Sequence, residues 1–245
     1  MVPYHKDYYI EKIKEYNNKI KPDINGSFSI DYTKNNCSFD GYLYEHKEGI
    51  EEKVVELKEG DRLWMRISPH EVQGCFESIK RAKGRVGVVG LGLGYFTQEI
   101  LKKREVTEVI VYEISNEIIE LYKKNFGEHK KLNIVVGDAF NADKQEFDFF
   151  FVDIYEYELR PQVVEDYVKF NDLHNIKEYS FWGLEHFLLS CPIDKIAWVY
   201  IPEEWMDMTR DLYDRFNEAG YVKYFSPVHE ELAINILEKF KKVFN

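Results

Sequence analysis

The stretch RVGVVGLGLGYFTQEILKK, from Arg85 to Lys103, decides how the rest of the chain is interpreted. It starts with a short run of valines, continues with three alternating glycines (Gly90, Gly92 and Gly94), and passes directly into a segment with helical character. Valine favours strands, whereas closely spaced glycines let the backbone turn tightly and approach a bound molecule. The stretch therefore predicts a strand, a ligand-binding loop and a helix in immediate succession.

Strands and helices continue to alternate after this stretch. The predicted strands are residues 108–113, 133–140, 147–156 and 195–202, and the predicted helices are residues 115–127 and 203–220. The strands are continuous apolar runs rather than alternating ones, which is typical of parallel strands buried on both faces. Ser115 and Gly127 are suited to begin and end the first of these helices. The pattern predicts a doubly wound, Rossmann-like α/β sheet.

The N-terminal part of the chain has a different pattern. An amphipathic helix is predicted up to about Pro22, and short β-rich segments separated by turn residues follow it, at 26–32, 40–46, 53–57 and 62–68. We therefore divide the chain into an N-terminal helix with a small antiparallel β region, residues 1–69, and a Rossmann-like domain, residues 70–245. A helix over residues 69–84 is predicted where the two join. Because the exposed edges of a small sheet invite pairing, we expect a homodimer.

The carboxyl ends of the predicted strands are the expected binding site, because parallel sheets of this kind bind ligands there. An acidic residue ends three of them in turn: Glu113, Asp138 and Asp153. The glycines do not suit a dinucleotide, because Tyr95 stands where the G-x-G-x-x-G pattern needs a small third residue. No Lys-Ser or Lys-Thr pair follows them, so they do not form a P-loop either. An adenosine whose ribose hydroxyls bond to Glu113 fits the pattern.

Four segments in this order, VVGLGLG, VYEIS, GDAF and FFFVDIYE, resemble the motifs of the class I S-adenosylmethionine-dependent methyltransferases. The resemblance extends from about Lys83 to Glu156, and the N-terminal part also resembles the spermidine synthase branch of that fold. It implies that S-adenosylmethionine is the cofactor, with its methionine portion against the glycine loop, its ribose on Glu113 and its adenine beside Asp138. The implied cofactor-binding residues are Gly90, Leu91, Gly92, Gly94, Glu113, Ile114, Asp138, Ala139 and Asp153.

The departures from both patterns concern the acceptor rather than the cofactor. Spermidine synthases usually carry an acidic residue in the glycine loop, where this chain has Leu91 and Leu93, and here DIYEYE replaces their Asp-Ser-rich segment. Methyl transfer from a sulfonium is an in-line displacement that depends mostly on positioning. Asp153, with Glu156 as a second candidate, is predicted to orient an amine acceptor and accept its proton, and Tyr155 is predicted to contact it.

Three functions are consistent with these residues. The preferred one is an S-adenosylmethionine-dependent methyltransferase that acts on a small molecule or a protein side chain. An aminopropyltransferase of the spermidine synthase type is the second, since the acidic composition suits a polyamine. The third is a non-catalytic protein of this fold that binds a partner through its N-terminal sheet. Such a protein has no need for Glu113 and Asp138.

Composition narrows the expected partners and compartment. The 245 residues carry a formal net charge of −11, which argues against nucleic acid as a partner, because nonspecific nucleic-acid binding needs a basic surface. No apolar run approaches the roughly 18 residues that cross a bilayer, so no membrane partner is expected. The three cysteines are far apart and form no C-x-x-C pair, so no metal site is predicted and a reducing cytoplasm is the expected compartment.

Some of these residues have simpler interpretations. His70 and Glu71 precede the helix expected near the pocket, but such a pair at a helix start is more often a cap or a partner of the helix dipole. Asp153 has the alternative role of capping its loop, since aspartate favours turns at strand ends. The aromatic segment 179–189 is interpreted as an amphipathic core helix, with an acceptor lid as the alternative.

Overall fold

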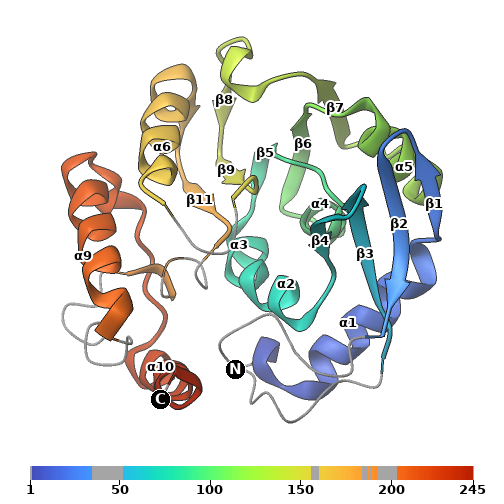
Figure 1. The fold of residues 1–245 in the computed structure, drawn as a ribbon. Coiled ribbons are helices and arrows are strands. Elements are labelled where there is room, and N and C mark those ends of the chain that lie inside the picture. Colours follow the sequence, from blue (N-terminus) through green and yellow to red (C-terminus); the bar gives the residue numbers. More distant parts are fainter. Residues whose placement is uncertain are drawn as a thin grey trace.

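The computed structural model describes residues 2–34, 52–155, 160–183, 187, 189–191 and 203–244, with only the backbone for 203–205 and 239–244. Its central feature is a five-stranded parallel sheet in the order β7–β6–β5–β9–β11 (Figure 1). The strands are β5 (Gly84–Val89), β6 (Val106–Glu113), β7 (Leu132–Val136), β9 (Phe149–Val152) and β11 (Tyr179–Phe181). Counted along the chain this order is 3-2-1-4-5, the order of Rossmann-like sheets. The predicted doubly wound α/β fold is confirmed.

Both faces of the parallel sheet are buried, and alternate residues of each strand supply the two cores. One core joins the sheet to α1 (Lys6–Lys19), α4 (Tyr95–Leu101) and α5 (Asn116–Phe126) through Val86, Val88, Val109, Val111, Phe149 and Phe151. The other joins it to α6 (Gln162–Leu173), α9 (Glu203–Glu218) and α10 (Glu230–Phe244) through Val89, Ile110, Tyr112, Phe150 and Val152. Since each strand is apolar on both sides, the sequence shows continuous apolar runs.

The N-terminal part forms an antiparallel sheet in the order β1–β2–β3–β4, as predicted. Its strands are β1 (Asp23–Asn25), β2 (Phe28–Thr33), β3 (Val54–Glu59) and β4 (Arg62–Arg66). In Figure 1 this sheet and the C-terminal helices α9 and α10 lie on opposite sides of the parallel sheet. Lys124 of α5 pairs with Asp23 at 2.7 Å, which ties the small sheet to the main one. The strand predicted at 40–46 lies outside the described residues.

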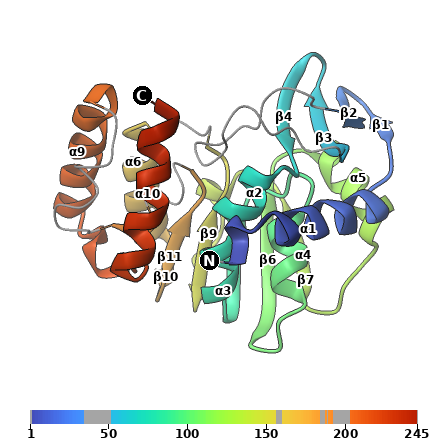
Figure 2. The ribbon, with the colours of Figure 1, turned by 90° about the horizontal axis from the view of Figure 1, so that it is seen from below.

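Helix α1 packs against α4, the helix that follows the glycine loop (Figure 2). The Tyr16 hydroxyl donates to Glu99 Oε1 at 2.8 Å, and Lys12 Nζ donates to Glu99 Oε2 at 2.8 Å. The rings of Tyr16 and Tyr95 meet edge to face, with centroids 5.0 Å apart. Because all four side chains are largely or wholly withdrawn from water, this contact is both apolar and charge-assisted.

The helix predicted over residues 69–84 forms as two short helices, α2 (Pro69–Gly74) and α3 (Phe76–Arg81). The prediction of one helix is wrong at Cys75, where the two meet. Gly74 precedes the break, and glycine is a poor helix former. A side chain at Gly74 would also come within 2.9 Å of Trp182 Nε1, so the indole lies directly against this point of the helix.

The interpretation of the segment from Tyr179 onward as a core helix is wrong for its first three residues. Tyr179, Ser180 and Phe181 form the edge strand β11, which pairs in parallel with Phe150, Phe151 and Val152 of β9. Aromatic residues suit a strand as well as a helix, and pairing with β9 decides between them. The strand predicted at 195–202 lies outside the described residues.

The remaining elements are short or complete the C-terminal part. They are η1 (Val2–Tyr4), η2 (Ala139–Asn141), η3 (Tyr221–Tyr224) and the parallel pair β8 (Glu146–Phe147) and β10 (Asn175–Ile176). Within the part of the chain that the structure describes, no helix combines the length and the apolar character that crossing a membrane requires. The division at residue 69, the homodimer and the cytoplasmic compartment stay predictions.

Candidate active site

The carboxyl ends of the parallel strands lie along one edge of the sheet, because all the strands run in the same direction. The residues that follow them are Gly90 after β5, Glu113 and Ile114 at the end of β6, Gly137 and Asp138 after β7, Asp153 and Ile154 after β9, and Trp182 after β11. Most of the residues that the sequence singled out therefore occupy this edge.

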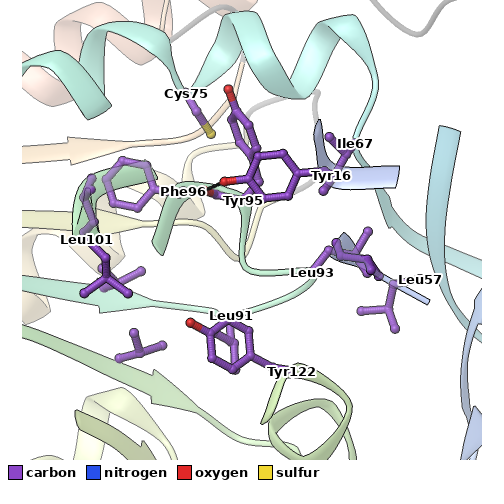
Figure 3. Close-up of a cluster of buried hydrophobic side chains, with 14 of the residues drawn as sticks. Tyr16, Leu57, Ile67, Cys75, Leu91, Leu93, Tyr95, Phe96, Leu101 and Tyr122 are labelled. Atoms are coloured by element: carbon purple, nitrogen blue, oxygen red, sulfur yellow. Dashed lines mark hydrogen bonds between the residues drawn. The ribbon is translucent and has the colours of Figure 1, made fainter. Parts of the chain in front are cut away.

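The glycine loop offers backbone rather than side chains to this edge. Gly90 and Gly92 have φ angles of +93° and +50°, in the region that favours glycine. A Cβ on Gly90 would overlap the carbonyl oxygen of Asp153, so the loop and the end of β9 lie in direct contact. Leu91 and Leu93 are buried and point into the core around Tyr122 and Tyr16 (Figure 3). The loop therefore presents no acidic side chain of its own between Gly90 and Gly94.

Glu113 is held in one orientation at the end of β6. Only 6% of its surface is exposed. Its Oε2 accepts the N–H of Leu91 at 2.9 Å, and its Oε1 accepts the N–H of Ser115 at 2.9 Å. Ser115 also caps α5 by accepting the N–H of Ile118. A carboxylate has about four lone-pair directions, so two hydroxyl groups of a ligand can still bond to it.

Three large apolar side chains are exposed at this edge. Ile114 is 72% exposed, Val136 52% and Ile154 48%, and each lies at or just beyond the end of a different strand. Exposed apolar residues that gather on one face mark a binding surface. Together with Glu113, they suit a ligand that has a flat apolar ring and a pair of hydroxyls.

Asp138 and Ala139 have local structural partners. The carboxylate of Asp138 accepts the N–H of Phe140 at 2.9 Å and the side-chain amide of Asn141 at 3.0 Å, and so caps η2. Ala139 is buried in the second core. A contact of these two residues with adenine stays a prediction.

A second carboxylate, Glu71 of α2, lies near enough to Asp153 for their charges to interact, and the sequence interpretation as a helix cap did not foresee this. Glu71 is only 5% exposed, and Cys75 Sγ donates to its Oε1 at 3.2 Å. Burial and the neighbouring charge of Asp153 raise the pKa of Glu71 well above its usual range, although contacts with Cys75 and Trp182 oppose the change. Burial also raises the pKa of Asp153, to about 7. The pair is therefore able to take up a proton near neutral pH.

His70 and Trp182 form one wall beside this pair. Their ring centroids are 5.2 Å apart, and Trp182 is fixed by its backbone N–H, which donates to Val152 at 2.9 Å. Burial lowers the pKa of His70 to about 3, so the imidazole is neutral at pH 7. His70 therefore adds no positive charge that would hold the neighbouring carboxyls ionised.

Tyr155 and Glu156 are predicted to act beside Asp153, and of the two the structure describes only Tyr155. Tyr155 packs on Phe181, with ring centroids 6.4 Å apart, and its hydroxyl is buried beside Tyr179 and Asp166. Burial raises the pKa of Tyr155, which keeps the phenol protonated. Glu156 lies outside the described residues. Contacts of either residue with an acceptor stay predictions.

Comparison with known proteins gives similarity to methyltransferases. No protein-family model matches the chain. Ribosomal RNA small subunit methyltransferase A of Campylobacter jejuni is 34% identical over 82 residues, which are 31% of this chain and 30% of that protein. The match thus spans less than a third of the curated relative.

Solved structures with a similar fold include methyltransferases and a spermidine synthase. Trm5b from Pyrococcus abyssi is 16% identical, with 67% of this chain and 45% of that chain covered and a TM-score of 0.40. Spermidine synthase from Thermotoga maritima is 19% identical, with 82% and 63% covered and a TM-score of 0.44. Both TM-scores are low.

The prediction that nucleic acid is an unlikely partner is wrong. The curated relative is named as a methyltransferase of ribosomal RNA. A net charge of −11 is a sum over the whole chain, whereas contact with nucleic acid depends on the charge of one local surface. The acidic composition therefore does not separate this chain from proteins that act on RNA. The resemblance that the motifs predicted is confirmed as a similarity: the chain has a Rossmann-like parallel sheet and is similar over 82 residues to a ribosomal RNA methyltransferase.

Proposed function

We propose that this chain is an S-adenosylmethionine-dependent methyltransferase whose acceptor atom is an amine nitrogen. The observation that carries the proposal is the position of two binding elements at one edge of the sheet. The glycine loop with Glu113 suits the nucleoside, and Asp153 with Glu71 lies directly beside that loop. Donor and acceptor chemistry are thus adjacent, which a displacement reaction requires.

Glu113, Ile114 and the glycine loop would hold the donor. The free lone pairs of Glu113 are suited to the two ribose hydroxyls, and the exposed side chains of Ile114 and Ile154 to the faces of the adenine. When bound, S-adenosylmethionine supplies a methyl group on a sulfonium and leaves as S-adenosylhomocysteine.

Asp153 and Glu71 would prepare the acceptor. An aliphatic amine is protonated at pH 7, and its nitrogen has a free lone pair only after losing that proton. Asp153, with a pKa of about 7, is suited to accept it. The new bond joins nitrogen to the methyl carbon, and the bond that breaks joins that carbon to sulfur. Two neighbouring acids also favour a cationic or hydrogen-bond-donating acceptor.

The buried leucines of the glycine loop favour methyl transfer over aminopropyl transfer. Decarboxylated S-adenosylmethionine carries a cationic amine at the end of its tail. Leu91 and Leu93 point into the core, so the loop provides no acid for that amine. The acceptor pools to be screened are small amines, proteins and RNA.

The test separates donor binding from transfer. Calorimetric titration with S-adenosylmethionine and S-adenosylhomocysteine should show binding to the parent protein and its loss in Glu113→Ala. Transfer of label from methyl-labelled S-adenosylmethionine to the three pools should then be abolished in Asp153→Asn and reduced in Glu71→Gln, with S-adenosylhomocysteine binding retained. A parent protein that binds neither nucleoside would end the enzyme proposal. Unchanged turnover in Asp153→Asn would remove Asp153 from its role.

A further inference from the structure

Met65 of strand β4 reaches from the N-terminal sheet onto the glycine loop. Its sulfur accepts the backbone N–H of Leu93 at 2.9 Å. A Cβ on Gly92 would overlap the same sulfur, so glycine at this position is what admits the side chain. Residues far apart in the sequence are thereby joined at the loop that the donor would contact.

Among the described hydrogen bonds of the loop's backbone N–H groups, the one donated by Leu93 has the weakest acceptor. The N–H of Gly90 donates to Tyr112, that of Leu91 to Glu113, and that of Gly94 to Leu91, and all three acceptors are oxygen atoms. The acceptor for Leu93 is a thioether sulfur, which is a weak acceptor. A carboxylate oxygen would bond to this N–H more strongly.

Strand β4 is built in a way that aims Met65 at the loop. The pairing of β3 with β4 shifts after the Leu57–Met65 pair, so that Lys58 faces Leu63 and Trp64 is the extra residue. Such a bulge re-aims the neighbouring side chain. β4 is also the last strand of its sheet, and both Leu63 and Trp64 are exposed. Among the described strands β4 pairs on one side only, so a local shift of it breaks fewer backbone hydrogen bonds than a shift of a central strand.

From these contacts we infer that Met65 competes with the donor at the glycine loop: it holds the Leu93 N–H until the α-carboxylate of the donor's methionine moiety replaces it. This inference rests on the proposed function. It makes the donor tail, rather than the nucleoside, the group that displaces Met65. A donor with an α-carboxylate is then preferred to its decarboxylated form, which has no anionic oxygen for Leu93.

The experiment compares two ligands that differ only in the tail. S-adenosylhomocysteine carries the amino-acid tail, and 5′-methylthioadenosine has the same nucleoside without it. Both are titrated by calorimetry into the parent protein, Met65→Leu and Met65→Ala. Met65→Leu keeps the apolar volume and removes the sulfur. It therefore still tests the inference if Met65→Ala unfolds the sheet. Leu63→Ala, on the same strand and exposed, is the control.

Both Met65 variants should bind S-adenosylhomocysteine about five- to tenfold more tightly, since the loss of one competing hydrogen bond is worth about that factor. Their affinity for 5′-methylthioadenosine should stay within about twofold. Equal changes for both ligands, or no change for either, would overturn the inference and leave the proposed function intact. Absence of binding of either ligand to all proteins would end both.

Discussion

Glu113 and Asp153 are two carboxylates at the same edge of one sheet, yet their surroundings are opposite. Two backbone N–H groups hold Glu113, one from the glycine loop and one from the start of α5. Asp153 instead lies against Glu71, and burial raises the pKa of Asp153 to about 7. The first arrangement holds a side chain in one orientation, which suits a group that positions a ligand, and the second suits a group that exchanges a proton. In the proposed function, binding and chemistry thus belong to different strand ends.

The largest expected effect is on the Glu113 side. Glu113→Ala should weaken S-adenosylhomocysteine binding at least about 100-fold, because two ribose hydroxyls lose a charged acceptor. The variant should also unfold more easily, since the N–H groups of Leu91 and Ser115 lose their acceptor. Calorimetry gives the first quantity and thermal unfolding the second. Glu105→Ala, just before the opposite end of the same strand, should change neither affinity nor Tm.

A substitution at Gly90 tests the contact between the glycine loop and Asp153 at the end of β9. Gly90→Ala should cost about 2–4 kcal/mol of unfolding free energy, because the new methyl group meets the carbonyl oxygen of Asp153 in addition to the backbone strain. Gly127→Ala is the matched control, since Gly127 also has a positive φ but nothing lies within 4 Å of its Cβ position. Denaturant unfolding of both variants measures the difference. Equal losses would show that strain alone acts at Gly90.

The protonation of Asp153 should be detectable as a pH dependence of folding stability. The pKa of Asp153 is about 7 in the folded protein and 3.8 ordinarily, so the folded state holds this proton more tightly. Raising the pH from 4 to 7 therefore reduces stability through this group. Asp153→Asn removes that loss and should stabilise the protein by on the order of 2 kcal/mol at pH 8. At pH 4 the difference should vanish. A difference in Tm that is the same at both pH values would contradict this assignment.

The smallest expected effect is that of removing the Ser115 hydroxyl, which caps α5 next to Glu113. Ser115→Ala should cost about 1 kcal/mol of stability, because α5 loses its cap. The backbone N–H of Ser115 that bonds to Glu113 remains, so the affinity for S-adenosylhomocysteine should change less than about threefold. Thermal unfolding and calorimetry on the same sample separate the two quantities. A large loss of affinity would mean that the cap, and not only the amide, positions Glu113.

The same contrast explains how much could be predicted from the sequence. The glycine loop, Glu113 and the cap at Ser115 are local features, each determined by a few consecutive residues, and the structure contains all three. The sheet followed from continuous apolar runs. The pair of Glu71 with Asp153 joins residues that are far apart in the chain, and no local pattern signals it. Glu71 two residues after Pro69 has the form of a helix start, so the local interpretation prevailed.

Tyr179–Phe181 shows the other limit. Its aromatic residues alternate too briefly to separate strand from helix, and pairing with β9 made the difference. The break at Cys75 is similar, because the indole of Trp182 against Gly74 comes from a distant segment. In both places a tertiary contact overrides the local preference.

The contacts between α1 and α4 couple the N-terminal helix to the glycine loop, which the proposed function assigns to donor binding. Tyr16 and Lys12 grip Glu99, one turn beyond the glycine loop. Removal of residues 1–69 would therefore uncover Tyr95 and leave Glu99 without Tyr16 and Lys12. The glycine loop would then lose the support of α1. Proteolytic nicking near residue 20 should, by the same reasoning, make the loop accessible to a second cut.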